Sequence, residues 1–224
     1  MTHASSHAHA RDRVRVSNVI VSTANKAGLD VLLPALPRGA TVYSTGGTMK
    51  AVRAILGDAG PVRWQTIESY TAYPEMPGGL VKTLHPRIHA GLLGDTHDPD
   101  HVAHMEEQGA VAFDLVVANL YPFTATVATP GATPEEIRQQ IDIGGPTMIR
   151  AAAKNHLRVA VAVEPDDYPA IAAELREHDG TLGYGTRLGM ARRAFQHIAA
   201  YDIAISAWFD QLSDAAAREA WRVA

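Results

Sequence analysis

Asp142 and Lys154 stand on either side of a Gly-Gly-Pro turn, and their side chains offer a proton acceptor and a cation. The two glycines of residues 144–146 let the backbone approach a ligand closely, and the proline suits the first turn of a helix. Good helix formers follow at 148–153, so a helix N-terminus is expected there. Its unpaired N–H groups could stabilise an anion or a developing oxyanion. The segment predicts a site for acid-base chemistry, with an ordinary loop and a solvated lysine as the alternative.

A second segment, residues 44–48, reads Ser-Thr-Gly-Gly-Thr and follows a short predicted strand at 40–43. Small residues let the backbone close on a phosphate, hydroxyl groups add donors, and a helix predicted at 49–56 supplies oriented N–H groups. The segment is not a P-loop, because no lysine ends it. We expect a phosphate cradle here, and a hydroxyl-rich helix cap is the alternative.

Two more loops carry polar side chains that could reach the same place. An irregular loop rich in proline and glycine contains Lys82 and Thr83, and an apolar strand predicted at 113–120 ends in Asn119 and Tyr121. Ligands of open parallel sheets bind beyond the carboxyl ends of the strands. Asn119 and Tyr121 are therefore candidate site residues, with core packing of Tyr121 as the competing interpretation.

Strands alternating with helices must position these loops. Strands are predicted at 16–21, 40–43, 62–67, 113–120 and 160–163, and helices at 29–36, 49–56, 133–141, 168–177 and 186–212, the last broken near Ala200. This order is typical of an α/β fold, a mostly parallel sheet flanked by helices, here with a C-terminal helical region. We expect a flexible tail at 1–15, one domain at 16–212 and a short C-terminal tail at 213–224.

Composition limits the class of protein. A chain of 224 residues with 46% hydrophobic content can bury a real core, and a net charge of -4 without a long basic run argues against a nucleic-acid binder. The absence of cysteine excludes disulfides and thiolate metal sites, and the histidines have no partners at ligand spacing, so we expect no metal. No apolar run reaches the roughly 18 residues of a membrane span, and no signal-peptide core begins the chain. We expect no membrane association and a cytoplasmic location.

Five segments resemble, in order and spacing, the IMP cyclohydrolase domain of the bifunctional purine-biosynthesis enzyme AICAR transformylase/IMP cyclohydrolase. They lie at 44–48, 81–86, 119–123, 141–156 and 194–202. The resemblance covers about residues 16–212 and implies the methylglyoxal-synthase-like fold, in agreement with the α/β pattern. It implies closure of 5-formamido-4-imidazolecarboxamide ribotide to inosine monophosphate and water, without metal or cofactor. It also implies a phosphorylated nucleotide as ligand, a homodimer, and a separate transformylase as a possible partner.

The resemblance assigns the chemistry to four residues, which are Lys82, Tyr121, Asp142 and Lys154. Asp142 would accept or orient the amide proton, Lys154 would stabilise the oxyanion, and Lys82 and Tyr121 would hold the carboxamide and relay protons. One tension is geometric. A helix from Pro146 to Lys154 rises roughly 12 Å at about 1.5 Å per residue, so Lys154 meets Asp142 only if the loop folds back along it.

Substrate binding is assigned, again by the resemblance, to a larger set. These residues are Lys26, Ser44, Gly46, Gly47, Thr48, Thr83, Asn119, Ile143 and Gly144. Asn119 would orient the base, the N–H groups of Ile143 and Gly144 would contact the oxyanion, and the others would hold the 5′-phosphate.

The chain departs from the family pattern at two places. The usual Ser-Asp-Lys-Thr-Gly is Ala-Asn-Lys-Ala-Gly at 24–28, and the arginine of Gly-Arg-Val-Lys is Leu80. A charge-assisted hydrogen bond is worth about 1.5–3 kcal/mol, so its loss would weaken binding about ten- to a hundredfold. Two alternatives follow: a diverged paralogue acting on a related purine or imidazole nucleotide in a specialised nucleoside pathway, and a non-catalytic nucleotide-binding module. The intact set of four catalytic residues argues against the second, and the matching motifs make methylglyoxal synthase itself a weaker candidate.

Overall fold

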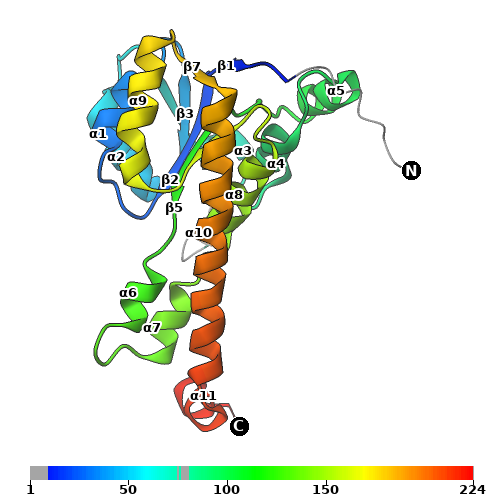
Figure 1. Cartoon of the computed structure of the whole chain (residues 1–224). Helices are drawn as coiled ribbons and strands as arrows, with labels where there is room; N and C mark the ends of the chain where they lie inside the picture. The colour runs from blue at the N-terminus through cyan, green and yellow to red at the C-terminus, as the bar shows by residue number, and fades with distance from the viewer. Residues whose placement is uncertain (1–9, 75, 77–80, 224) are drawn as a thin grey trace.

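The core of the fold is a five-stranded parallel sheet. The computed structural model describes residues 10–74, 76 and 81–223. In spatial order the strands are β4 (Arg63–Thr66), β3 (Thr41–Ser44), β2 (Asn18–Thr23), β5 (Leu115–Asn119) and β6 (Ala160–Ala162). Of these, β2, β3 and β5 are labelled in the upper part of Figure 1. All neighbouring strands pair in parallel, which confirms the predicted α/β class. Their carboxyl ends therefore meet at one edge of the sheet, where ligands of such folds bind.

Helices cover both faces of this sheet (Figure 1). One face carries α1 (Leu29–Leu32), the 3₁₀ turn Leu33–Ala35, α2 (Gly46–Leu56) and α9 (Tyr168–Glu177). The other carries α3 (Ile67–Thr71), α4 (Pro86–Leu93), α8 (Gly144–Lys154) and α10 (Tyr184–Gln211). The remaining helices are α5 (Pro99–Glu107), α6 (Phe123–Val127), α7 (Pro134–Gln139), α11 (Asp214–Trp221) and the 3₁₀ turn Pro165–Asp167. Within the described part of the chain, no helix is long and apolar enough to cross a membrane.

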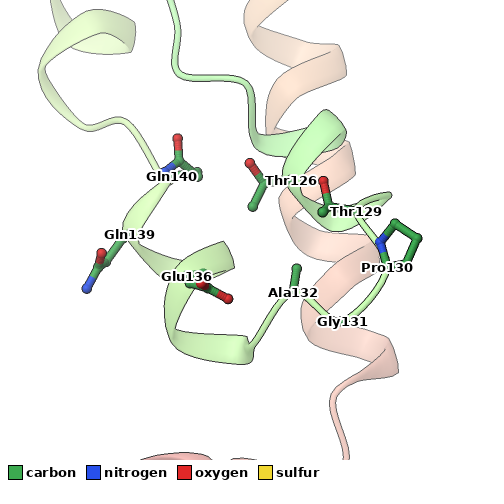
Figure 2. Close-up of a pocket in the computed structure, with 8 residues that line it drawn as sticks. All are labelled: Thr126, Thr129, Pro130, Gly131, Ala132, Glu136, Gln139 and Gln140. Atoms are coloured by element: carbon green, nitrogen blue, oxygen red, sulfur yellow. The ribbon is translucent and has the colours of Figure 1, made fainter.

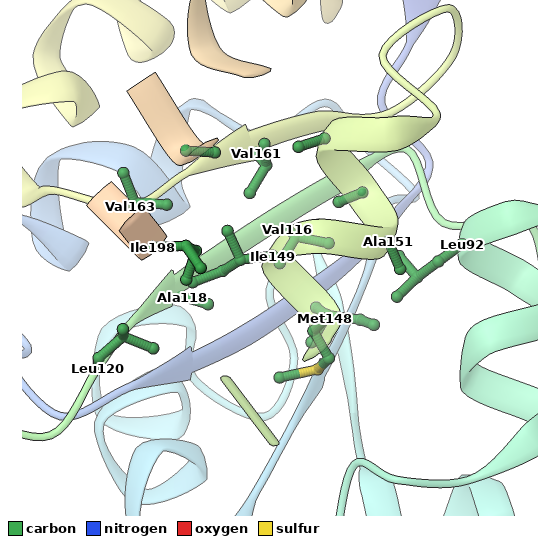
Figure 3. Packing of buried hydrophobic residues seen from close by; sticks show 14 of the residues in the cluster. Leu92, Val116, Ala118, Leu120, Met148, Ile149, Ala151, Val161, Val163 and Ile198 are labelled. Carbon is green, nitrogen blue, oxygen red and sulfur yellow. The ribbon is translucent and has the colours of Figure 1, made fainter. Parts of the chain in front are cut away.

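The central strands are apolar on both sides because each side meets a helical layer. In β2, Val19 and Val21 pack toward α1, α2 and α9, whereas Ile20 between them packs toward α4, α8 and α10. Figure 3 shows Val116 of β5 beside Ile149 of α8 in the second layer. An unbroken apolar run, rather than an alternating one, is therefore what this sheet requires.

Residues 13–15, expected within the N-terminal tail, form a short strand β1 (Arg13–Arg15) that pairs antiparallel with β7 (Thr181–Gly183). Arg187 fixes the residues that precede β1 against the rest of the protein. Its side chain is fully buried, and its guanidinium donates hydrogen bonds to the carbonyl oxygens of Asp12 and Leu182. A buried arginine needs such acceptors, and the chain supplies them from the backbone.

The C-terminal helices differ from the sequence prediction. α10 runs for 28 residues without interruption, so the expected break near Ala200 is wrong. Buried side chains recur along it at Ile198, Tyr201 and Trp208, which keeps one helical face in contact with the core. Residues expected in the C-terminal tail form α11, whose Trp221 donates a hydrogen bond to Glu135 at 2.7 Å.

Gly91 in α4 provides a test of this packing. A Cβ there would collide with the carbonyl oxygen of Val111 and lie 2.9 Å from the Phe113 ring, so we expect Gly91→Ala to lower the free energy of unfolding by about 1–3 kcal/mol. The matched control is Gly189→Ala in α10, where the nearest atom, on Arg193, is 3.8 Å away. The control should be neutral or about 0.4–1 kcal/mol more stable. Urea denaturation measures the free energy of unfolding of both variants. Equal changes in the two variants would contradict the close packing at Gly91.

Candidate active site at the carboxyl edge of the sheet

The start of α8 touches two other segments so closely that only glycine fits. A Cβ on Gly144 would lie 2.5 Å from the Thr83 hydroxyl oxygen. A Cβ on Gly145 would lie 2.7 Å from a methyl group of Leu120 and 2.8 Å from a carboxylate oxygen of Asp142. The Gly-Gly sequence therefore brings the loop of Thr83, the end of β5 and the helix N-terminus into one place.

Asp142 lies at the centre of this junction. Its carboxylate accepts a hydrogen bond from the Gly145 N–H at 2.8 Å, and the N–H groups of Tyr121 and Gly144 also donate to it. Burial raises the pKa of Asp142 above the ordinary aspartate value, and these three hydrogen bonds partly oppose the shift. A carboxylate has about four acceptor positions, so one is left to accept a proton from a ligand.

A second part of the edge is built around the carbonyl oxygen of Thr23 at the end of β2. It accepts hydrogen bonds from the Lys26 ammonium and from the Thr48 hydroxyl, each at 3.0 Å, which holds the ammonium beside the first turn of α2. The N-cap residue of α2 makes no side-chain cap, and a Cβ on Gly47 would meet nothing within 4 Å. An uncapped helix N-terminus with two exposed glycines thus lies beside an exposed lysine, as an anion site requires.

The hydroxyl groups of this segment are less available than the sequence suggested. Ser44 is fully buried, and Thr48 is 3% exposed with its hydroxyl engaged by the backbone of Thr23. Gly46 and Gly47 are exposed. In this structure the backbone, rather than the hydroxyl groups, presents donors at the cradle.

Asn119 joins the loops that follow β2 and β5. Its amide oxygen accepts the Asn25 N–H at 2.8 Å, and its amide nitrogen donates to the Asn25 carbonyl at 2.9 Å. Asn25, which departs from the family pattern, also accepts the Ala27 N–H at 3.0 Å and so shapes its own turn. A cavity of about 250 Å³ opens beside this pair, and its lining includes Asn25, Asn119, Tyr121, Glu164, His197 and Tyr201.

Three of these lining residues received no role from the sequence. The His197 imidazole lies 2.9 Å from the Glu164 carboxylate, and the Tyr201 hydroxyl donates to the Gln140 carbonyl at 2.8 Å. The same hydroxyl accepts the N–H of Asp142 at 2.9 Å. The spacing of four between His197 and Tyr201 on one helix was the available signal, since such residues share a helix face.

The structure brings most predicted site residues together, but it does not place Lys154 with them. Lys154 is the last residue of α8 and is exposed. The next residue, Asn155, donates to the Leu92 carbonyl at the end of α4, and Arg158 donates to Phe113 just before β5. Lys154 therefore lies toward the amino edge of the sheet.

Lys82 is half-buried beside Thr83, whereas Leu80 lies outside the described residues.

A larger cavity of about 400 Å³ lies away from this edge, between α6 and α7 (Figure 2). Its one charged lining residue is Glu136, whose carboxylate is occupied by the cap of α7 through Thr133. It offers no set of groups comparable with that at the sheet edge. Across the described ranges, no group of three or more His, Asp and Glu side chains could hold a metal ion.

Two family models match the chain. Residues 36–147 match the MGS-like domain, and residues 152–223 match the AICARFT/IMPCHase bienzyme. The first match contains the α2 cradle and the Asp142 junction, and the second begins within α8 and contains α10.

Known proteins of similar sequence and structure agree with these matches. The chain is 47% identical over 200 residues to the bifunctional purine biosynthesis protein PurH of Neisseria meningitidis serogroup A, and 47% identical over 200 residues to PurH of Neisseria gonorrhoeae. Each alignment covers 89% of this chain and 37% of the relative, so the chain spans little more than a third of their length. The crystal structure of ForH is similar with a TM-score of 0.70 and 29% identity, over 87% of this chain and 99% of ForH.

The raised pKa of Asp142 predicts a pH dependence of stability. A carboxyl group whose pKa is higher in the folded state stabilises the fold below its unfolded pKa of about 4, and this contribution is lost as the pH rises through the folded pKa. Asp142→Asn keeps an acceptor and cannot ionise. We therefore expect the stability of Asp142→Asn relative to wild type to increase as the pH rises from the unfolded-state pKa of Asp142 to its folded-state pKa.

Thermal melts at several pH values measure this difference. Asp210→Asn, on an exposed part of α10, removes the same charge and serves as the reference. A relative stability that stays constant, or that falls as the pH rises, would contradict a raised pKa at Asp142.

Proposed function

The chain belongs to the MGS-like domain family and matches the IMP cyclohydrolase domain of the AICARFT/IMPCHase bienzymes, and from that membership we propose that it is an IMP cyclohydrolase. It would close the ring of 5-formamido-4-imidazolecarboxamide ribotide to inosine monophosphate. The observation that carries the proposal is the Asp142 carboxylate, which is held by three backbone N–H groups next to a helix N-terminus at the carboxyl edge of the sheet.

The reaction needs proton transfers and stabilisation of one oxyanion. The carboxamide nitrogen attacks the formyl carbon and forms the ring bond, the formyl oxygen gains negative charge, and that oxygen leaves as water after protonation. Asp142 would accept the amide proton through its remaining acceptor position. The N–H group of Ile143 would stabilise the oxyanion, since that of Gly144 already donates to Asp142, and Lys82 and Tyr121 would hold the carboxamide and supply protons. Tyr121 is 49% exposed beside the cavity, so it is accessible for this role.

The 5′-phosphate would bind at the start of α2. Lys26 lies beside the first turn of this helix, because its ammonium and the Thr48 hydroxyl both donate to the Thr23 carbonyl, and Gly46 and Gly47 are exposed. The buried hydroxyl groups of Ser44 and Thr48 would support the shape of the cradle. Thr83, which packs on Gly144, would also hold the 5′-phosphate, and Asn119 would orient the base.

We propose further that the chain acts in the cytoplasm as a homodimer and works with a transformylase activity. The transformylase is supported by the relatives, which are bifunctional purine biosynthesis proteins more than twice as long as the aligned region. The homodimer and the location are expected from the resemblance to the family. A transformylase would supply the formylated substrate that this site consumes.

The first test is turnover by the purified protein, with product followed by absorbance and chromatography. We expect conversion of the formylated ribotide to inosine monophosphate, and we expect Asp142→Asn to lower kcat by about 10²–10⁴, the usual contribution of a general base. Wild-type protein that is folded and binds the ribotide but makes no product would refute the proposed activity. Turnover by Asp142→Asn at the wild-type rate would refute the role of Asp142.

Lys154 gives a separate test of the geometry. Because α8 separates it from Asp142 by roughly 15 Å at about 1.5 Å per residue, we expect Lys154→Ala to lower kcat less than about tenfold in the isolated chain. Lys82→Ala is the comparison, since Lys82 adjoins Thr83 and should be needed. A loss for Lys154→Ala equal to that for Asp142→Asn would show that the end of α8 does reach the reacting atoms in the active protein.

A further inference from the structure

Tyr201 holds the segment that presents Asp142. α7 ends at Gln139 and α8 begins at Gly144, so residues 140–143 form the connection between them. The Tyr201 hydroxyl donates to the carbonyl of Gln140 at 2.8 Å and accepts the N–H of Asp142 at 2.9 Å. One hydroxyl group therefore fixes the backbone of the connection at two points.

The ring that carries this hydroxyl is itself well fixed. Tyr201 is 9% exposed, and its ring meets that of Phe123 edge-on, with centroids 6.0 Å apart. Burial, reinforced by the negative charges of Asp142 and Asp202, raises the pKa of the hydroxyl, and the hydrogen bond from the Asp142 N–H only partly opposes it. The hydroxyl stays protonated at neutral pH, so its proton is available for Gln140 and its oxygen for Asp142.

Two residues on the same face of α10 make comparable contacts one and two turns earlier. The His197 imidazole lies 2.9 Å from the Glu164 carboxylate, and Arg193 lies 3.0 Å from that of Asp167. Both acidic residues belong to the segment that follows β6. The long helix thus contacts, at intervals of four residues, the segments that border the carboxyl edge of the sheet, and Tyr201 is the member that reaches the Asp142 connection.

We infer that Tyr201 is a positioning residue for the cyclisation, and that its hydroxyl sets the place and orientation of the Asp142 carboxylate without touching the substrate. This inference rests on the proposed function. The carboxylate receives its three hydrogen bonds from Tyr121, Gly144 and Gly145, which lie on two different segments. The carboxylate keeps all three hydrogen bonds only while residues 140–143 stay at their present distance from both of these segments.

The variant that tests this role is Tyr201→Phe, which removes one oxygen atom. We expect kcat to fall about ten- to a hundredfold while KM changes less than about twofold, because the phosphate and base contacts remain. Loss of backbone hydrogen bonds should also raise the pKa of Asp142, so the acidic limb of the pH profile of kcat should move to higher pH. Lower stability alone would not move that limb.

Tyr70→Phe is the matched control. Tyr70 is also buried, and its hydroxyl also accepts a backbone N–H, that of Val111 at 3.0 Å, but this contact lies toward the amino end of β5. We expect it to lose similar stability and to keep the wild-type kcat and pH profile. If Tyr201→Phe behaves like Tyr70→Phe in the assay, the inference is wrong.

A second measurement separates this inference from the proposed function. An NMR titration of the Asp142 carboxyl group in wild type and Tyr201→Phe needs no turnover, and we expect the higher pKa in the variant. An unchanged pKa would overturn the inference even in an active enzyme, whereas a raised pKa in an inactive protein would reject only the activity. If Tyr201→Phe does not fold, Phe123→Leu is the second variant, because it removes a ring that packs against Tyr201 and keeps the Tyr201 hydroxyl. We expect it to raise the pKa of Asp142 as well. An unchanged pKa of Asp142 in this variant would also overturn the inference.

Discussion

The close contact at Gly144 and Gly145 is the constraint on which the candidate site depends. Neither residue has room for a Cβ, since Thr83 lies against the first and Leu120 and Asp142 against the second. Through this contact a helix N-terminus, a strand end and an irregular loop share one small volume. The carboxylate of Asp142 can then take hydrogen bonds from two segments at once, which no local turn could provide.

Burial and hydrogen bonding act in opposite directions on that carboxylate. Desolvation favours the neutral acid, whereas N–H donors favour the anion. The outcome is a pKa above the ordinary value in a group that still has well-placed donors, a combination suited to a group that must both accept and return a proton. The cradle at α2 is arranged differently, with a cation beside an uncapped helix N-terminus, which would suit a permanent anion.

α10 connects these local arrangements to the fold as a whole. Its apolar face packs on β6 and α8, while Arg193, His197 and Tyr201 contact segments at the edge of the sheet. A break near Ala200 would have separated Tyr201 from the other two. The continuous helix instead holds Arg193, His197 and Tyr201 in a fixed arrangement. It stays continuous because Ile198, Tyr201 and Trp208 are buried at helical spacing.

The α/β class and the mostly parallel sheet could be predicted from the amino-acid pattern, because apolar runs such as that of β5 are buried between two layers. The sequence also identified the segments of the site, since Gly-Gly turns, hydroxyl-rich caps and strand ends carry local signals. It could not decide which side chains meet. The occupied hydroxyl of Thr48 and the contact of Tyr201 with Gln140 and Asp142 depend on residues far apart in the chain. Such contacts follow from how helices pack on the sheet, and only the tertiary structure fixes that packing.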